Sequence, residues 1–414
     1  MSDSELIPHL FRTEYSKIIA VLCRRFGIER IGMAEDIAGE TFLTATQSWG
    51  LNGVPPNPVA WLYNVAKNKA RTLLQRDHVF DRKIAAELRD RPVDADGYVQ
   101  PGEEIDLSPQ HINDSQLQMM FCICHPSISA EAQIGLSLRI LCGFGIEEIA
   151  DAFLTSKETI NKRLFRAKEK LREEKIQIGL PGPSEIGERL EGVLATIYLL
   201  FNEGYYSLSQ DKKVRKDLCL EAMRLCTMLV ENNSIDSPSA AALLALMCFH
   251  ASRFEARQNE SGEMILYEEQ DTSLWNTDLI SKGGYFLRRA ASGDRLSRYH
   301  LEAGIAYWHT QGGDTKEKWE NILQLYNHLL QMEYSPVAAL NRTYALSRAD
   351  GKEVAIAEAE KLPMEGNPFY HALLGELYCG IDDPKAVLHF GKALALARTD
   401  ADRHALQRRR DKLF

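Results

Sequence analysis

Apolar residues recur at helical spacing along most of the sequence. Residues 5–30 carry this pattern, and a second segment follows over 34–49. Three prolines and two glycines within residues 50–58 interrupt it and predict a loop. A further helix is expected from Pro58 to about residue 77, with the proline in its first turn. More helices are expected over 115–141 and beyond 184, so the pattern predicts an all-α fold.

Residues 145–171 predict two short helices separated by a turn at 154–156. Ser156 is suited to cap the second helix, and Glu158 places negative charge in its first turn. Ile160, Leu164 and Ala167 face inward, which leaves a basic outer face. A short helix, a tight turn and a basic second helix are typical of a helix-turn-helix that binds the DNA major groove. An amphipathic helix pair with a solvated charged face is the alternative.

Two segments nearer the N-terminus carry charged faces. Asp36 and Glu40 lie four residues apart, a spacing that is mildly unfavourable for like charges on one helix. This favours a surface on which a basic partner docks, with a solvated acidic face as the alternative. The helix expected over 58–77 has a basic, amide-bearing side whose cations would neutralise phosphates and whose amides could hold an unstacked base.

The remaining segments predict the domain organisation. Residues 78–114 are rich in Asp, Glu, Pro and Gly, and we interpret them as an acidic linker. Residues 180–184 (LPGPS) predict a boundary, after which helices continue to the C-terminus. We therefore expect helical domains over 1–77 and 115–178 and a third, larger helical part over 184–414.

The C-terminal part contains a weak repeat of the tetratricopeptide type. Ile322, Ala355 and Ala386 are separated by about 33 and 31 residues, and a second set follows four residues later. The last unit fits best, with its packing residues at Tyr370, Leu374, Leu377, Ala386, Phe390 and Ala393. The repeat predicts an α-solenoid whose concave face could hold a peptide or another domain.

Composition limits the functional classes. A chain of 414 residues predicts two or three domains. No apolar run is long enough to span a membrane, and residues 1–10 lack a basic leader, so a cytoplasmic location is expected. The net charge of −9 argues against free, non-specific DNA binding by the whole chain.

Candidate catalytic and metal-binding chemistry is sparse. Cys122 and Cys124 precede His125, but no second Cys/His pair lies at zinc-site spacing. We therefore expect these cysteines to be buried thiols, and we expect the protein to bind no metal or cofactor. The sequence has no phosphate-binding glycine loop and no Gly-x-Ser-x-Gly, so no enzyme is predicted. We interpret residues 268–271 (EEQD) as a helix end rather than a pocket rim, and residues 408–410 (RRR) as a solvated helix end.

Three motifs in order resemble an extracytoplasmic-function (ECF) sigma factor of the sigma-70 family. AEDIAGETFLTATQSW is similar to the helix that docks on the β′ clamp helices of RNA polymerase, and NPVAWLYNVAKNKARTLL to the segment that melts and reads the −10 element. GIEEIADAFLTSKETINKRLFRAKEKL is similar to the helix-turn-helix that reads the −35 element. HPSISAEAQIGLSLRILCGF, YLLFNEGY, EEQDTSLWNTDLISKG and YHLEAGIAYWHT resemble the ECF subgroup with a helical, TPR-like C-terminal extension.

The resemblance implies a role for individual residues. It implies polymerase docking by Asp36, Glu40, Phe42 and Leu43. For the −10 element it implies Trp61, Lys67, Asn68, Lys69, Arg71 and Arg76, with Trp61 expected to hold its helix. For the −35 element it implies Lys157, Thr159, Asn161, Lys162, Arg163, Phe165, Arg166 and Lys168. Gly39 and Asn161 depart from the family pattern, and Asn161 replaces an arginine with an amide suited to adenine.

The resulting expectation is a promoter-specificity subunit whose partners are the polymerase core, through the β′ clamp helices and the β flap, and promoter DNA. The C-terminal part is expected to control activity, either by masking the other domains or by binding a peptide or protein ligand. The alternative is an operator-binding regulator with a TPR-like sensor, which would not need the 34–49 and 58–77 surfaces.

Overall fold

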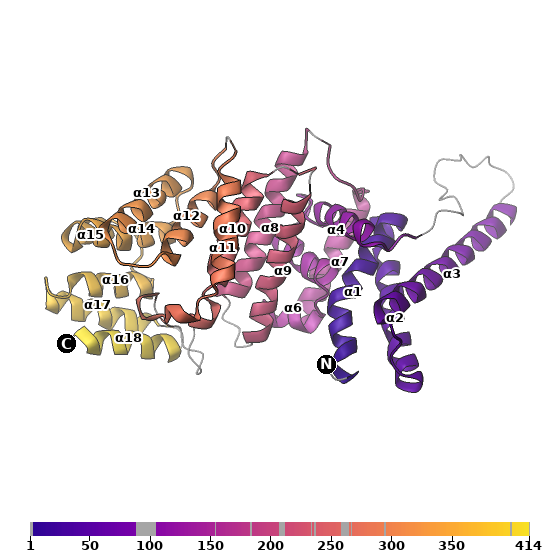
Figure 1. Cartoon of the computed structure of the whole chain (residues 1–414), viewed down its shortest axis with the longest axis horizontal. Coiled ribbons are helices and arrows are strands. Elements are labelled where there is room, and N and C mark those ends of the chain that lie inside the picture. Colours follow the sequence, from indigo (N-terminus) through magenta and orange to yellow (C-terminus); the bar gives the residue numbers. More distant parts are fainter. Residues whose placement is uncertain are drawn as a thin grey trace. The chain divides into compact units, whose positions relative to one another are not determined.

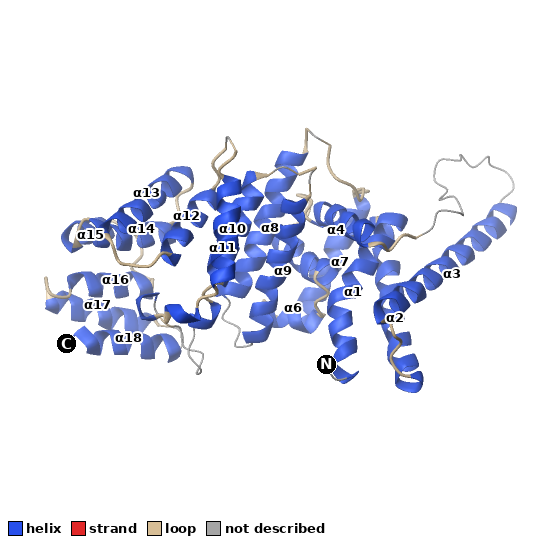
Figure 2. Ribbon diagram, viewed as in Figure 1, coloured by secondary structure: helices blue, strands red, loops and turns tan. Residues whose placement is uncertain are grey.

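The computed structural model describes residues 3–87, 105–153, 155–182, 184–206, 212–232, 234–235, 237–257, 265, 267–293, 295–397 and 400–413. Every regular element within these ranges is helical (Figure 2). The all-α fold expected from the apolar spacing is therefore confirmed. The chain divides into two compact units, residues 1–228 and 229–414.

The first unit is built around α1, which packs against both α2 and α4 (Figure 1). Tyr15, Ile18, Ile19 and Leu22 make the buried side of α1, each 2% exposed or less. The elements of this unit are α1 (Asp3–Phe26), η1 (Ile28–Arg30), α2 (Ile31–Asn52), α3 (Pro58–Glu87), α4 (Pro109–Ile123), α5 (Ala130–Leu136), the π-helical turn η2 (Ser137–Leu141), α6 (Ile146–Ala152), α7 (Lys157–Glu173), α8 (Ile186–Tyr206) and α9 (Lys212–Glu231).

Two expected loops begin later than the sequence indicated. Helix α2 continues through Gly50 to Asn52, and the break comes at Gly53, whose φ of 78° suits glycine. Helix α3 continues to Glu87, so the expected linker does not begin at residue 78. The C-terminal end of the expected linker, up to residue 114, is also helical, because α4 begins at Pro109. Ser108 caps this helix, and Pro109 lies in its first turn. The central part of that linker, residues 88–104, lies outside the described residues.

The break at residues 180–184 does not separate compact units. Helix α8 contacts α4 and α5, and Arg189 donates to the Phe121 carbonyl. Arg224 of α9 donates to the Leu141 carbonyl at 2.8 Å. Both helices therefore belong to the first unit, although the sequence placed them with the C-terminal part.

The second unit contains three successive helical hairpins, α12–α13, α14–α15 and α16–α17. Gly375 lets α16 and α17 approach closely, because a Cβ atom there would lie 2.8 Å from the Phe390 ring. All six packing residues expected in the last repeat are buried. The elements are α10 (Pro238–Ala251), η3 (Phe254–Ala256), η4 (Tyr267–Glu269), η5 (Thr272–Leu274), α11 (Thr277–Ala290), α12 (Arg298–Thr310), α13 (Lys316–Met332), α14 (Pro336–Ala349), α15 (Lys352–Ala359), α16 (Pro368–Tyr378), α17 (Asp383–Leu396) and α18 (Asp400–Leu413).

Candidate nucleic-acid interface

Helices α6 and α7 form the expected helix pair. The Ser156 hydroxyl accepts from the Thr159 backbone N–H and so caps α7. Gly145 precedes α6, and the Glu148 carboxylate accepts from its backbone N–H at 2.7 Å. The inward positions of α7 are buried against α5 and α6. These positions are Ile160, Leu164, Ala167 and Leu171. Leu154, in the expected turn, lies outside the described residues.

The outer face of α7 is open to solvent at most of the positions that the sequence singled out. Phe165 is 65% exposed, which is unusual for a phenylalanine that packs in a core. The exposed polar residues on this face are Lys157, Thr159, Asn161, Lys162 and Arg166. Lys157 forms an ion pair with Glu147 of α6, which lowers the pKa of Glu147. This face combines cations, an amide and an aromatic ring, as DNA-reading helices do.

A groove of about 610 Å³ runs between α7 and the start of α5. Lys162, Arg163, Arg166 and Lys170 bring four cations to it. Ser127 and Ser129 add hydroxyl groups from the segment before α5, and Thr159 adds one from α7. Cations with hydroxyl donors are the usual ligands of backbone phosphates. The sequence analysis missed Ser127 and Ser129, since only the fold places residues 127–129 beside α7.

Two further expected −35 residues, Lys168 and Arg163, also contact groups within the protein. The Lys168 ammonium donates to Glu35 of α2, and its side chain is only 19% exposed. Arg139 of η2 reaches the same carboxylate, with Nε 3.7 Å from Oε1. Arg163 is half-buried and its guanidinium lies 5.9 Å from the centre of the Phe153 ring. Lys168 thus joins α7 to α2 in this structure and does not offer its charge to DNA.

Helix α3 presents the residues expected at the −10 element. Tyr63 donates to the buried Glu14 of α1 at 2.5 Å, and burial together with this hydrogen bond raises the pKa of the tyrosine. Asn68, Arg71 and Arg76 are exposed, whereas Lys67 is half-buried. Trp61 packs edge-on against Trp49 of α2 with ring centres 5.3 Å apart. Trp61 therefore holds the helix, as the sequence analysis expected.

The acidic face of α2 is open at three of its four expected residues. Asp36, Glu40 and Leu43 are exposed, and Leu43 is 58% exposed. Glu40 accepts from Lys69 of α3 at 3.0 Å. The carboxylate expected to dock on the polymerase therefore offsets the charge of a lysine expected to contact DNA. A direct contact by Phe42 is ruled out in this structure, because the side chain is 4% exposed and packs on Phe11.

The burial of Phe42 has a signal in the sequence. Residue 42 lies on the same helical face as Ala38, Ala45 and Trp49, at spacings of four, three and seven. All three neighbours on that face are buried. An apolar residue on such a stripe packs inward, whereas Leu43 points away from it.

The described residues hold no group of three His, Cys, Asp or Glu side chains that could bind a metal ion. Burial raises the pKa of Cys122 to about 12 and that of Cys124 to about 11, so both thiols stay protonated. Over the described part of the chain, no helix is both long and apolar enough to cross a membrane.

Comparisons with known proteins identify relatives of this chain. A family of unknown function (DUF6596) matches residues 189–291, a segment that begins in α8 and ends just after α11. An uncharacterized protein of Rhizobium meliloti (strain 1021) is 32% identical over 406 residues, which cover 96% of this chain and 93% of that protein. No solved structure matches the chain significantly. Because the similarity extends over nearly the full length of both chains, this protein belongs to the same family as the Rhizobium meliloti protein.

Proposed function

We propose that this protein is an ECF-type sigma factor that directs RNA polymerase to promoters. The proposal rests on the three ordered motifs in residues 34–171 and on one structural observation. That observation is the exposed outer face of α7 beside a groove that carries four cations. In this role α7 reads the −35 element, α3 reads the −10 element, and Asp36, Glu40 and Leu43 dock on the polymerase. The chain itself catalyses nothing in this role, and we place it in the cytoplasm.

Phosphate contacts supply most of the affinity in this proposal. Lys162, Arg166 and Lys170 bind the DNA backbone along the groove, so affinity falls steeply with salt. Base contacts at Asn161 and Asn68 add specificity of about 1–3 kcal/mol each. We infer that the second unit controls activity, because its helical hairpins resemble modules that bind peptides and proteins.

The packing of α1 against α4 constrains this mechanism. The centres of −10 and −35 elements lie about 25 base pairs apart, or about 85 Å. A compact unit of 228 residues has a radius of gyration of only about 17 Å. The first unit cannot contact both elements in its present form. We therefore infer that α1–α3 separate from α4–α7 when the polymerase binds.

A second candidate function follows from the same packing. An operator-binding regulator reads one site, so it would keep α1 and α4 together. The buried hydrogen bond from Gln116 of α4 to Ser16 of α1, at 3.2 Å, supports a permanent interface. The exposed Asp36 and Leu43 have no evident use in this alternative.

Run-off transcription distinguishes the two functions. Purified core polymerase is combined with the full chain on a template that carries the chain's own upstream region. A sigma factor yields a transcript of defined length and co-elutes with core polymerase. Binding to duplex DNA by the protein alone, without either result, would instead establish the operator-binding regulator.

Removing groove cations is expected to lower the salt dependence of DNA binding. Arg166→Gln and Lys162→Gln each delete a contact with a backbone phosphate, so each reduces the slope of log K against log salt by about 1. Fluorescence anisotropy on a labelled promoter, between 50 and 200 mM salt, measures this slope.

Arg172→Gln is the matched control for these two variants. Arg172 lies on the same helix, pairs with Glu169 and does not line the groove. An equal loss of slope in this variant would show that the groove makes no special contact.

A further inference from the structure

The second unit contains an aromatic pocket of about 280 Å³, which we call the Tyr344 pocket. It is walled by Tyr267, His309, Trp319, Tyr326, Asn341 and Tyr344, which come from η4 and helices α12, α13 and α14. Its lining also includes Glu268, Arg409 and the apolar Ile322 and Ala345. The volume suits one amino-acid side chain rather than a cofactor, whose pockets are larger.

The walls of this pocket are held firmly. The Tyr267 hydroxyl donates to the His309 carbonyl at 2.8 Å and accepts from Lys318 at 3.0 Å. Lys318 is 4% exposed and also donates to the Gln311 carbonyl at 2.9 Å. The Trp319 and Tyr344 rings meet edge-on with centres 5.4 Å apart. The pocket is thus preorganised.

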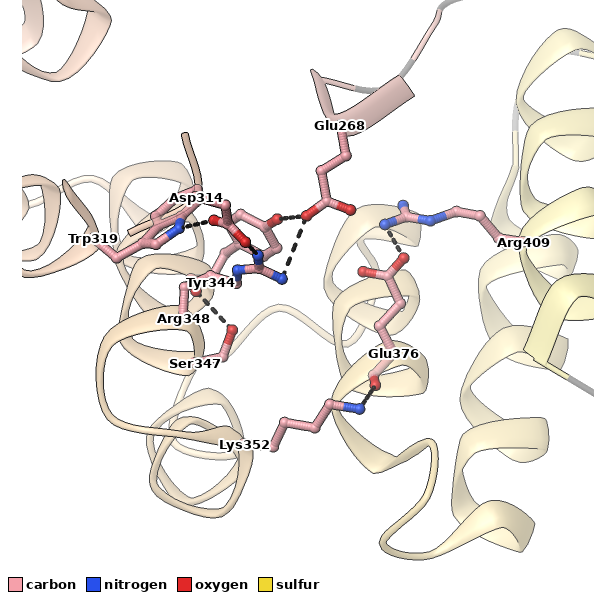
Figure 3. A network of polar contacts seen from close by, with 9 residues as sticks. All are labelled: Glu268, Asp314, Trp319, Tyr344, Ser347, Arg348, Lys352, Glu376 and Arg409. Atoms are coloured by element: carbon pink, nitrogen blue, oxygen red, sulfur yellow. Dashed lines mark hydrogen bonds and ion pairs between the residues drawn. The ribbon is translucent and has the colours of Figure 1, made fainter. Parts of the chain in front are cut away.

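Four lining residues of the pocket, Glu268, Trp319, Tyr344 and Arg409, belong to a network of polar contacts (Figure 3). Glu268 accepts from the Tyr344 hydroxyl and lies 3.7 Å from Arg348, which also pairs with Asp314. Arg409 reaches in from α18 and pairs with Glu376 of α16. Glu268, Asp314 and Glu376 therefore face two guanidinium groups, and they would face one if Arg409 left.

Two other cations near this network are committed elsewhere. Lys318 is bonded to oxygen atoms on the α12–α13 loop, and Lys352 donates to the Glu376 and Cys379 carbonyls at the end of α16. Without Arg409, Glu376 loses its ion pair with that residue, and Glu268 keeps only Arg348 as the guanidinium described beside it.

The aromatic rings around the pocket already pair with cations. Arg348 lies 5.5 Å from the centre of the Trp319 ring, and Arg253 lies 5.4 Å from that of Tyr267. Burial, with Arg253 and Lys318 nearby, lowers the pKa of His309 to about 3, so this imidazole is neutral at physiological pH. Its buried Nδ1 atom has no hydrogen-bond partner among the described residues. Aromatic faces, carboxylates and a neutral imidazole acceptor together suit a cation.

Arg409 places its own guanidinium group at this rim. The sequence analysis expected residues 408–410 to form a solvated helix end, but the Arg409 side chain is only 28% exposed and ion-paired. Among the described residues of α18, Leu406 is the buried apolar side chain, and it packs against α16 and α17. Movement of α18 away from this rim breaks the Leu406 packing, the Arg409–Glu376 ion pair and a hydrogen bond from Arg403 to the Ala397 carbonyl.

We propose that the Tyr344 pocket is a binding site for an arginine side chain of a partner polypeptide, and that Arg409 guards it. The partner's guanidinium enters when α18 moves away, lies against Tyr344 and Trp319, and pairs with Glu268. Glu268 thus belongs to a pocket rim, the interpretation that the sequence analysis did not favour. This proposal does not depend on whether the protein is a sigma factor.

The test uses full-length protein and a short capped peptide, acetyl-Gly-Arg-Gly-amide, in calorimetric titrations. Arg409→Ala and Arg409→Gln are expected to bind this peptide at least tenfold more tightly than the natural protein. Arg410→Ala is the matched control, because Arg410 lies on the same helix and pairs with the adjacent Asp411. The same peptide with citrulline, a neutral isostere of arginine, should not bind. Glu268→Gln, added to Arg409→Ala, should lose at least tenfold in affinity.

Three results would overturn the proposal. One is equal affinity of the natural protein and both Arg409 variants for the arginine peptide. Another is equal binding of the citrulline peptide. The third is binding of benzoate by the natural protein that disappears in Arg409→Ala, which would assign Arg409 to a carboxylate ligand. Thermal unfolding of each variant confirms that it is folded.

Discussion

A fragment of residues 1–178 will fail to fold cooperatively, whereas a fragment of residues 1–232 will fold. The shorter fragment lacks α8, whose Leu190, Val193, Leu194 and Ile197 are buried in a helix that packs on α4 and α5. Each such side chain contributes about 1.5–3 kcal/mol, so their loss costs about 6–12 kcal/mol. This is comparable to the whole stability of a typical domain, about 5–15 kcal/mol.

Thermal unfolding followed by circular dichroism, with gel filtration, will compare these two fragments. The 1–232 fragment keeps α9, whose Arg224 and Asp217 contact the Leu141 carbonyl and Arg12 of the first unit. Full-length protein serves as the reference for its melting temperature. A cooperative melt of 1–178 within a few degrees of 1–232 would contradict the unit boundary. A truncated protein for transcription assays that test the role of the C-terminal part should therefore end after α9.

The second large effect is expected from Glu35→Gln. Glu35 holds both Lys168 and Arg139, and all three side chains are less than a quarter exposed. Removing the carboxylate takes the ion-pair partner from Lys168, while Arg139 still donates to the Phe144 carbonyl and the Tyr15 hydroxyl; this costs about 1–3 kcal/mol. The loss destabilises the closed arrangement of α2 and α7 and frees Lys168 for DNA. Promoter-specific initiation at limiting protein should rise about tenfold, since 1.4 kcal/mol corresponds to a factor of ten.

Glu169→Gln provides the control, because it removes a carboxylate from α7 whose partner Arg172 lies outside the groove. Run-off transcription and the melting temperature are measured for both variants. Under the sigma proposal, Glu35→Gln lowers the melting temperature and raises initiation, while the control changes neither. A lower melting temperature without any gain in initiation would show that separation of α2 from α7 does not limit promoter binding.

The helix-turn-helix was readable from the sequence because its determinants are local. The cap at Ser156 and the inward stripe on α7 all lie within about five turns of helix. The last helical repeat was readable for the same reason, since its packing residues recur within two adjacent helices. The residues expected on the outer face of α7 are exposed, except for the half-buried Lys168 and Arg163.

The remaining errors involve partners far apart in the chain. Glu35 and Lys168 are separated by 133 residues, and no local pattern indicates that they meet. Pro181 and Gly182 lie between α7 and α8, but a helix break does not show whether the next helix packs on the preceding or the following part of the chain. Arg409 appeared solvated because its partner, Glu376, lies on another helix. The groove residues Ser127 and Ser129 were missed for the same reason.

The contacts of Arg12 set a timetable for folding during synthesis. Its guanidinium pairs with Glu148 and with Asp217, and lies 4.3 Å from the centre of the Phe144 ring. Asp217 is 205 residues downstream. At about 5–20 residues per second, a ribosome needs roughly 10–40 s to make that stretch. The pairing of Arg12 with Asp217 is therefore made late in synthesis, after α2 and α4, which cover the apolar side of α1, have already been synthesised.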